Sequence, residues 1–111
     1  MVVRTKNITK LKYNVTPNRK GSVIYIPFDA DANQLIQVDG ISGLTFVPDN
    51  TNAEPLASTL IRVKADGTNT PTVTGFTKTS TSSDYDTTLN KINVFSFFFD
   101  GTDYWYSITI S

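Results

Sequence analysis

The sequence contains no cysteine and no histidine. Without cysteine, the chain has neither a disulfide framework nor a thiolate nucleophile. Without histidine, it lacks the commonest general base and the commonest side-chain metal ligand. A Ser-His-Asp or Cys-His catalytic arrangement is therefore impossible, and we expect this protein not to be an enzyme.

Glutamate is almost absent as well, since Glu54 is the only one in 111 residues. Aspartate, asparagine, serine and threonine are abundant instead, which is typical of strands and turns rather than of helices. No apolar run approaches the ~18 residues that a membrane-spanning helix requires. We therefore predict a single all-β domain over residues 1–111 that has no membrane partner.

A calcium loop is the one metal motif that the sequence partly matches. Residues 29–33 read D-A-D-A-N, as at the start of such a loop. The match then fails, because Gln34 stands where glycine is needed and Gly40 stands where the bidentate acid is needed. The sequence also has no glycine-rich phosphate loop, so we expect no metal ion and no cofactor.

Positive charge is concentrated at the N-terminus. Residues 1–20 contain six basic residues and no acidic one, although the net charge of the whole chain is zero. This segment is interpreted either as a basic edge strand or arm, where lysine discourages aggregation, or as an arm that docks on an acidic partner surface such as a neighbouring copy. Lys10 and Lys12 share the outer face of a strand predicted over 8–15, and they are candidate subunit contacts. The bases are not interleaved with stacking aromatics, so no nucleic-acid partner is expected.

The C-terminal stretch KINVFSFFFDGTDYWYSITI, residues 91–110, predicts a β-hairpin. Side chains alternate between the two faces of a strand. Asp100-Gly101 separates the two apolar runs, which is a strong hairpin signal. One face of the hairpin is therefore expected to carry Phe95, Phe97, Phe99, Tyr104, Tyr106, Ile108 and Ile110.

Two registers fit this hairpin. A two-residue loop pairs Phe97 with Tyr104, whereas a four-residue loop pairs Phe99 with Tyr104. Both keep the same residues on the same face, while a one-residue slip would not. Phe98 and Trp105 then lie on the opposite face. If the chain does not bury them, they form an exposed aromatic patch, and such a patch marks a contact with another molecule.

The rest of the chain shows short apolar runs separated by turn signals every 8–12 residues. Pro27 is expected to end a strand or to lie at a sheet edge, and Gly75 is expected to mark a bulge or bend. This spacing predicts an antiparallel β-sandwich or jelly roll of about eight short strands. Besides 8–15 and the hairpin, strands are expected at 22–28, 34–39, 44–47, 59–65 and 71–76.

Residues 77–90, TKTSTSSDYDTTLN, predict a long surface loop, and long loops are often functional. Its single aromatic residue, Tyr85, lies between Asp84 and Asp86. This trio is a candidate glycan contact, in which the ring stacks on a pyranose and the carboxylates accept hydrogen bonds from hydroxyl groups. The alternative is that Tyr85 packs against the sandwich and anchors the loop. Trp105 is the fourth candidate glycan contact.

The last half of the chain resembles a known family. The succession TPTVTGF, a Ser/Thr loop and then NVFSFFFDGTDYWYSITI is similar to the terminal β-sandwich domains of bacteriophage virion proteins. The shared pattern is an asparagine before an aromatic strand, Asp-Gly, an aromatic pair and a short final strand. Tail-fibre heads, head fibres and capsid-decoration proteins contain such domains. The resemblance implies a homotrimer that attaches to the particle or binds a cell-surface glycan, and it carries over no catalytic residues.

Two functions follow as hypotheses. The first is a structural, non-enzymatic virion protein, either a capsid- or tail-associated accessory or decoration subunit, on the outer surface of the particle. It would contact other virion proteins and its own copies, with Lys10, Lys12, Phe98 and Trp105 at the subunit interface. The second is a glycan-binding host-adhesion module that uses Asp84, Tyr85, Asp86 and Trp105.

Overall fold

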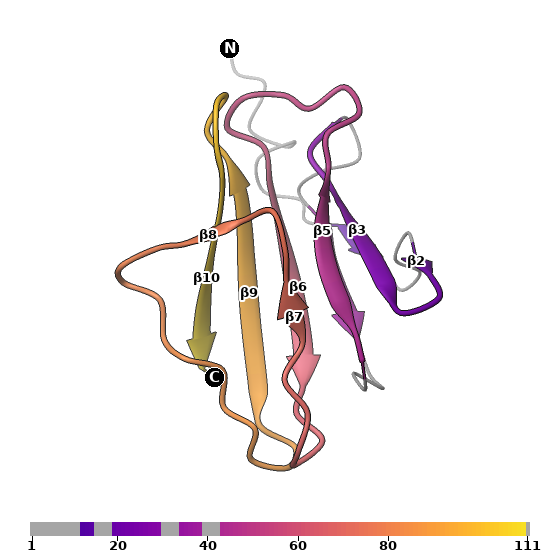
Figure 1. Cartoon of the computed structure of the whole chain (residues 1–111), viewed down its shortest axis with the longest axis vertical. Helices are drawn as coiled ribbons and strands as arrows, with labels where there is room; N and C mark the ends of the chain where they lie inside the picture. The colour runs from indigo at the N-terminus through magenta and orange to yellow at the C-terminus, as the bar shows by residue number, and fades with distance from the viewer. Residues whose placement is uncertain (1–11, 15–18, 30–33, 39–42, 111) are drawn as a thin grey trace.

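The computed structural model describes residues 12–14, 19–29, 34–38 and 43–110, and within these ranges it contains strands, turns and loops but no helix. The strands form two sheets (Figure 1), as the composition predicted for an all-β protein. In spatial order, the six-stranded sheet contains β1 (Lys12–Asn14), β4 (Gln34–Val38), β6 (Ser58–Lys64), β9 (Ile92–Phe99), β10 (Tyr104–Ile110) and β8 (Thr77–Lys78). The four-stranded sheet contains β2 (Arg19–Lys20), β3 (Val23–Pro27), β5 (Thr45–Asp49) and β7 (Thr72–Val73).

The chain crosses from one sheet to the other at six of the nine steps between successive described strands. From β3 to β8, consecutive strands belong to alternate sheets, so neighbours within a sheet are two strands apart in sequence. A strand that returns after one excursion to the opposite sheet runs in its original direction. The pairs β3–β5, β5–β7 and β4–β6 are therefore parallel. The pairs β1–β4 and β8–β10 are parallel as well, although two strands of the other sheet separate the first pair in sequence and β9 of the same sheet separates the second.

The expectation of an antiparallel arrangement is consequently wrong for most of the described pairings. Only β2–β3, β6–β9 and β9–β10 are antiparallel. A parallel pair needs a long crossover connection, and here the strand of the opposite sheet supplies it. Turn signals at 8–12-residue spacing occur in both arrangements, so they could not distinguish hairpins from crossovers.

The predicted C-terminal hairpin is confirmed, with the longer of the two loops. Phe99 pairs with Tyr104 and Phe97 pairs with Tyr106, which leaves four residues in the turn. β9 shows strict alternation, with Phe95 and Phe97 buried and their neighbours partly exposed. The hairpin lies between β6 and β8, where it interrupts the parallel order of the sheet.

The core lies between the two sheets and is largely aromatic. Phe46 of β5 packs edge-on against Phe95 and Phe97 of β9, with ring centroids 5.2 and 5.6 Å apart. Phe28, directly after β3, contacts the ring of Tyr104 of β10 at 5.2 Å. Aromatic pairs in such tilted or edge-to-face geometry stabilise a core beyond the area that they bury. The remaining buried apolar residues are Ile24, Ile26, Leu44, Ala57, Ile61, Val63, Ala65 and Ile108.

Two proline and glycine predictions are confirmed. β3 ends at Pro27, whose carbonyl oxygen accepts a hydrogen bond of 2.8 Å from the buried Thr59 hydroxyl of β6, across the two sheets. The strand predicted over 71–76 is reduced to Thr72–Val73. Gly75 follows it with φ +85°, and a Cβ at this position would lie 2.8 Å from Pro48 Cδ. Only glycine suits such a bend.

The loop after β8 protects the outer edge of β10. The amide of Thr79 donates to the carbonyl of Tyr106, and the amide of Ser83 donates to the carbonyl of Ile108. The amide of Ile108 donates to the Ser82 hydroxyl at 2.7 Å. An unpaired strand edge is a template for aggregation, and this loop satisfies the edge with its own backbone and one serine.

Phe97 and Phe98 give a matched test of the hairpin's faces. Phe97 is fully buried, so Phe97→Ala removes a core ring and should lower the free energy of unfolding by about 3–5 kcal/mol. Phe98→Ala changes the opposite, partly exposed face and should cost about 1 kcal/mol or less. Urea unfolding of both variants measures the difference. Equal losses would contradict the assignment of the two faces.

Candidate functional site

The candidate site lies on the outer face of the six-stranded sheet, opposite the core. Trp105 and Phe98 are direct cross-strand partners there, and both are only partly buried. They are neighbours because the four-residue turn sets the register and because their positions alternate with the buried residues of β9 and β10. The sequence predicted this opposite-face placement, and the structure leaves both rings partly exposed in the single chain.

The turn between β9 and β10 fixes the tryptophan. The Asp100 carboxylate accepts hydrogen bonds through Oδ1 from the amides of Thr102 and Asp103, at 2.8 and 2.7 Å. Its Oδ2 accepts a hydrogen bond from the indole nitrogen Nε1 of Trp105 at 2.9 Å. The bond from the Asp103 amide is the main cause that lowers the pKa of Asp100 below its ordinary value, followed by the bonds from Trp105 and Thr102. One ionised side chain therefore closes the turn and orients the indole.

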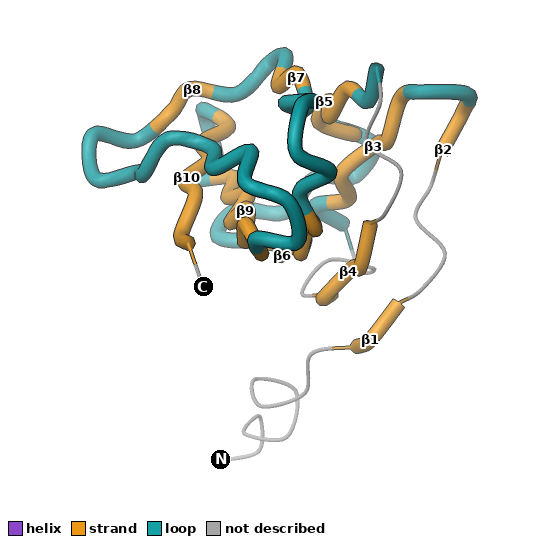
Figure 2. The backbone as a smooth tube through the Cα atoms, turned by 90° about the horizontal axis from the view of Figure 1, so that it is seen from below, coloured by secondary structure: helices purple, strands orange, loops and turns teal. Residues whose placement is uncertain are grey.

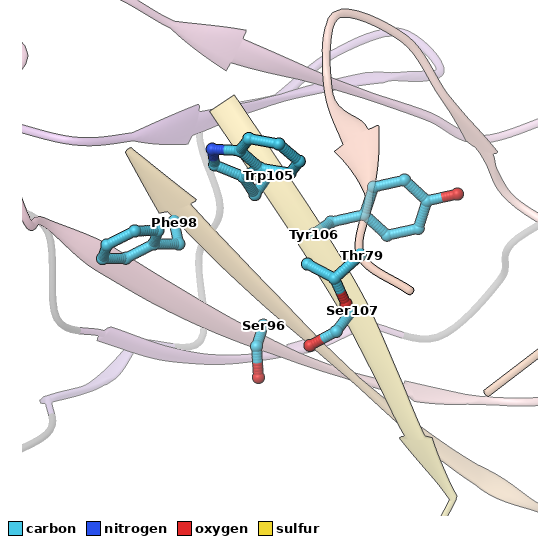
Figure 3. A pocket seen from close by; sticks show the side chains of 6 residues that line it. All are labelled: Thr79, Ser96, Phe98, Trp105, Tyr106 and Ser107. Atoms are coloured by element: carbon cyan, nitrogen blue, oxygen red, sulfur yellow. The ribbon is translucent and has the colours of Figure 1, made fainter. Parts of the chain in front are cut away.

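A pocket of about 390 Å³ opens beside these rings (Figure 3). The large rings of Phe98 and Trp105 stand above the small side chains of Ser96 and Ser107, which are themselves cross-strand partners. The hollow follows from this contrast in side-chain size. The residues that line it are Thr79, Ser96, Phe98, Trp105, Tyr106 and Ser107.

The lining of this pocket is mainly apolar, its side-chain polar groups are hydroxyls, and none of the lining side chains is charged. Within the described ranges, neither Ser96 nor Ser107 uses its hydroxyl in a hydrogen bond with another residue. The Thr79 hydroxyl lies 3.5 Å from that of Thr81. Figure 3 shows the Tyr106 ring turned away from the indole, so the hydroxyl group of this residue does not point into the pocket.

Tyr85 of the 77–90 loop is placed as an anchor, which was the alternative to a glycan contact. Its ring packs against the core and lies 5.9 Å from that of Phe95. The hydroxyl oxygen is buried and has no hydrogen-bond partner among the described residues. Burial, with smaller contributions from the charges of Asp66 and Asp86, raises the pKa of Tyr85 to about 12.

The two aspartates beside Tyr85 also have local partners. Asp84 forms an ion pair of 2.6 Å with Lys78 of β8, and this contact lowers the pKa of the carboxyl group. Asp86 accepts a hydrogen bond from the amide of Thr88. The buried side chain of Asn93 accepts a hydrogen bond from the Asp86 amide and donates one to the Asp86 carbonyl. These contacts hold the loop against the sheet.

The structure does not bring together the four residues predicted to contact a glycan. Tyr85 packs on Phe95 at the inner face of the sheet, whereas Trp105 lies on the outer face. Trp105 instead lies beside Phe98 on the neighbouring strand, and the two residues were predicted together as part of a subunit interface. Of the other interface candidates, Lys10 lies outside the described residues, and Lys12 is placed only by its backbone, in β1 beside Gln34.

The sequence alone did not single out Ser96, Ser107, Thr79 or Asp100. The two serines could have been found, because they share the alternation of Phe98 and Trp105. The contact between Asp100 and the indole depends on the four-residue turn, which the sequence left open. Thr79 reaches the site through the β8–β10 pairing between segments far apart in sequence.

A second, smaller cavity of about 160 Å³ lies beside Tyr85 and Tyr106. It is lined mainly by apolar side chains of the core, together with Thr70 and Lys78.

Among the described residues, no three potential ligands of the types His, Cys, Asp and Glu lie close enough to hold a metal ion. The described part of the chain also has no helix able to cross a membrane.

No family model, curated protein or solved structure matches this chain. Its function is therefore inferred from the geometry of the site and from the pattern of the hairpin.

Tyr85→Phe and Tyr85→Ala distinguish the contribution of the Tyr85 hydroxyl to stability from that of the ring. Removing only the unpartnered hydroxyl should keep or raise the free energy of unfolding, by up to about 1 kcal/mol. Removing the ring should lower it by about 2–4 kcal/mol, because the ring packs on Phe95. Urea unfolding measures both effects. A marked loss of stability in Tyr85→Phe would mean that the hydroxyl is hydrogen-bonded.

The Asp100 carboxylate should make the turn sensitive to acid. Its pKa is lower in the folded chain than its ordinary value of 3.8, so its contribution to stability is complete above that value. The contribution is lost as the pH falls from 3.8 toward the folded pKa, and the indole loses its ionised acceptor there. Trp105 fluorescence and thermal unfolding, followed from pH 6 to pH 2, should show this change.

Asp100→Asn should remove the acid-dependent change in Trp105 fluorescence, while Asp103→Asn in the same turn should keep it. Each variant removes one negative charge, at the first or at the last residue of the same turn, but only Asp100 accepts the indole hydrogen bond. An acid profile in Asp100→Asn that matches the unmodified protein would contradict the assigned role of Asp100.

Proposed function

We propose that this protein is a structural, non-enzymatic subunit of a bacteriophage particle. It would be a capsid- or tail-associated accessory or decoration protein on the outer surface, bound to other virion proteins and to its own copies as a homotrimer. The sequence pattern of the C-terminal hairpin supports this proposal. The finer fold class, a β-sandwich, is part of it, and two sheets that share one core are consistent with that class.

The observation that carries the proposal is the outer face of the six-stranded sheet. Leu60, Val94 and Phe98 alternate with buried neighbours on β6 and β9, so they point away from the core, and all three are only partly buried. Apolar side chains that share one exposed face are typical of a contact between proteins. We assign this β6–β9 part of the face to contacts between copies.

Assembly is tested by the mass of the purified protein in solution, from light scattering after size exclusion. The expected mass is about three times that of the 12.3 kDa chain. Leu60→Lys places a charge in the proposed contact and should reduce the mass to that of one chain. Leu89→Lys changes an apolar residue that is 63% exposed in the loop before β9, and it should leave the mass unchanged.

Purified particles provide the second readout, because the proposal requires that the protein is retained on them. A single-chain mass for the unmodified protein, together with its absence from particles, would contradict the proposed function. A trimer that Leu60→Lys does not affect would contradict only the assigned contact.

A second candidate function is a glycan-binding adhesion module, and the pocket beside Trp105 favours it. This proposal moves the glycan contact away from Asp84, Tyr85 and Asp86, which contact the sheet and their own loop, and keeps Trp105. The site would be on the β9–β10 part of the outer face, where it borders the proposed contact between copies and shares Phe98 with it.

A further inference from the structure

We propose that the pocket beside Trp105 binds one neutral pyranose unit of a glycan, with the indole face as the stacking surface and the Ser96 and Ser107 hydroxyls as hydrogen-bonding groups. This inference rests on the second proposed function, glycan binding. It names the class of sugar, keeps Trp105 from the contact residues that the sequence had indicated, and replaces Asp84, Tyr85 and Asp86 by Ser96 and Ser107.

The indole is held in place before any ligand arrives. Its nitrogen donates to Asp100 Oδ2 at 2.9 Å, and the other oxygen of that carboxylate is fixed by two backbone amides of the turn. Trp105 also stands beside Phe98 across the two strands. A ring that is already ordered loses less conformational entropy on binding, so its exposed face is suited to stack on the C–H face of a sugar ring.

The same hydrogen bond helps to identify the ligand. Aromatic-lined grooves also recognise extended proline-rich peptides, and such recognition gains from ring N–H or O–H groups that donate to peptide carbonyls. The indole N–H of Trp105 is already used by Asp100, and Figure 3 shows the Tyr106 ring turned away. A pyranose needs only the ring face, because one side of the sugar presents C–H groups.

The hydroxyls of the pocket complement those of a sugar. Ser96 and Ser107 are direct partners on adjacent strands, and both line the pocket below the two rings. Each hydroxyl can donate one hydrogen bond and accept two, and the described residues leave both groups without a hydrogen-bond partner. A hydroxyl-rich ligand can use both directions of hydrogen bonding.

The absence of charge from the lining selects a neutral sugar. None of the six lining residues is ionised, so a carboxylate or phosphate on the ligand would find no cation there. Lys78, on the strand next to β10, lines the other cavity and is paired with Asp84 at 2.6 Å. The volume of about 390 Å³ is near the lower end of the range for small-molecule pockets, which fits one or two sugar units.

Trp105 is the only tryptophan of the chain, so its fluorescence reports directly from the pocket. The intact protein would be titrated with methyl glycosides of glucose, galactose, mannose and N-acetylglucosamine and with neutral disaccharides. N-acetylneuraminic acid and glucuronic acid serve as charged comparisons. A glycan array would extend the survey to larger neutral and acidic glycans.

The expected result is a saturable change in Trp105 fluorescence with at least one neutral sugar and none with the acidic ones. On the array, which needs no tryptophan, Trp105→Ala should weaken binding by about tenfold or more, and Trp105→Phe should restore part of it. Ser96→Ala and Ser107→Ala should each weaken it severalfold. Thr109→Ala, on the same face of β10 but outside the pocket, should bind as the unmodified protein does.

Three results would overturn the inference: no neutral glycan bound on the array or in the titration, unchanged binding by Trp105→Ala, or equal losses in Thr109→Ala and Ser107→Ala. Unfolding midpoints within a few degrees of the unmodified protein would show that the variants are folded. Light scattering separates this inference from the assembly proposal. A Leu60→Lys protein that has lost its trimer but still binds sugar would leave the pocket assignment intact, and a Trp105→Ala trimer that no longer binds would leave the assembly assignment intact.

Discussion

The carboxylate of Asp100 accepts two hydrogen bonds from the backbone of the β9–β10 turn and a third from the indole of Trp105. The first two close a four-residue loop, and that loop sets Phe99 opposite Tyr104. Because side chains alternate along a strand, this register also places Phe98 beside Trp105 on the outer face. The pairing of Phe98 with Trp105 is therefore a consequence of this turn, and the third hydrogen bond orients the ring that the site displays.

The sequence predicted those features that depend on neighbouring residues. Alternation identified Phe95 and Phe97 as core residues, the ring of Pro27 predicted a strand end, and Gly75 predicted a bend where a Cβ would collide with Pro48. Strand direction was not predictable in the same way. It depends on which sheet receives the next strand, and short polar connections look alike whether they close a hairpin or cross between sheets.

The candidate site was predicted in part for the same reason. Trp105 and Phe98 follow from alternation, and Ser96 and Ser107 could have been added by extending it. The proposed partnership of Trp105 with Tyr85 ignored the sheet between them, because a sequence gives no distance between a loop and a strand. The buried Asn93 side chain, which clamps the backbone of Asp86, shows why that loop lies against the sheet.

The outer face is free of the packing constraint that governs the core, so its mixture of side chains has to be explained by something else. Protein interfaces are closely packed. If the aromatic rings served only as a contact between copies, we would expect the side chains around them to be of similar size. On the β6–β9 side, the larger apolar side chains are Leu60, Val94 and Phe98, and Ser96 lies between the last two and opposite Leu60. Between β9 and β10, however, Ser96 and Ser107 lie next to the rings and leave a hollow of about 390 Å³. A second copy would have to fill this hollow with a matching protrusion, whereas a sugar ring can stack on its aromatic wall and form hydrogen bonds with Ser96 and Ser107.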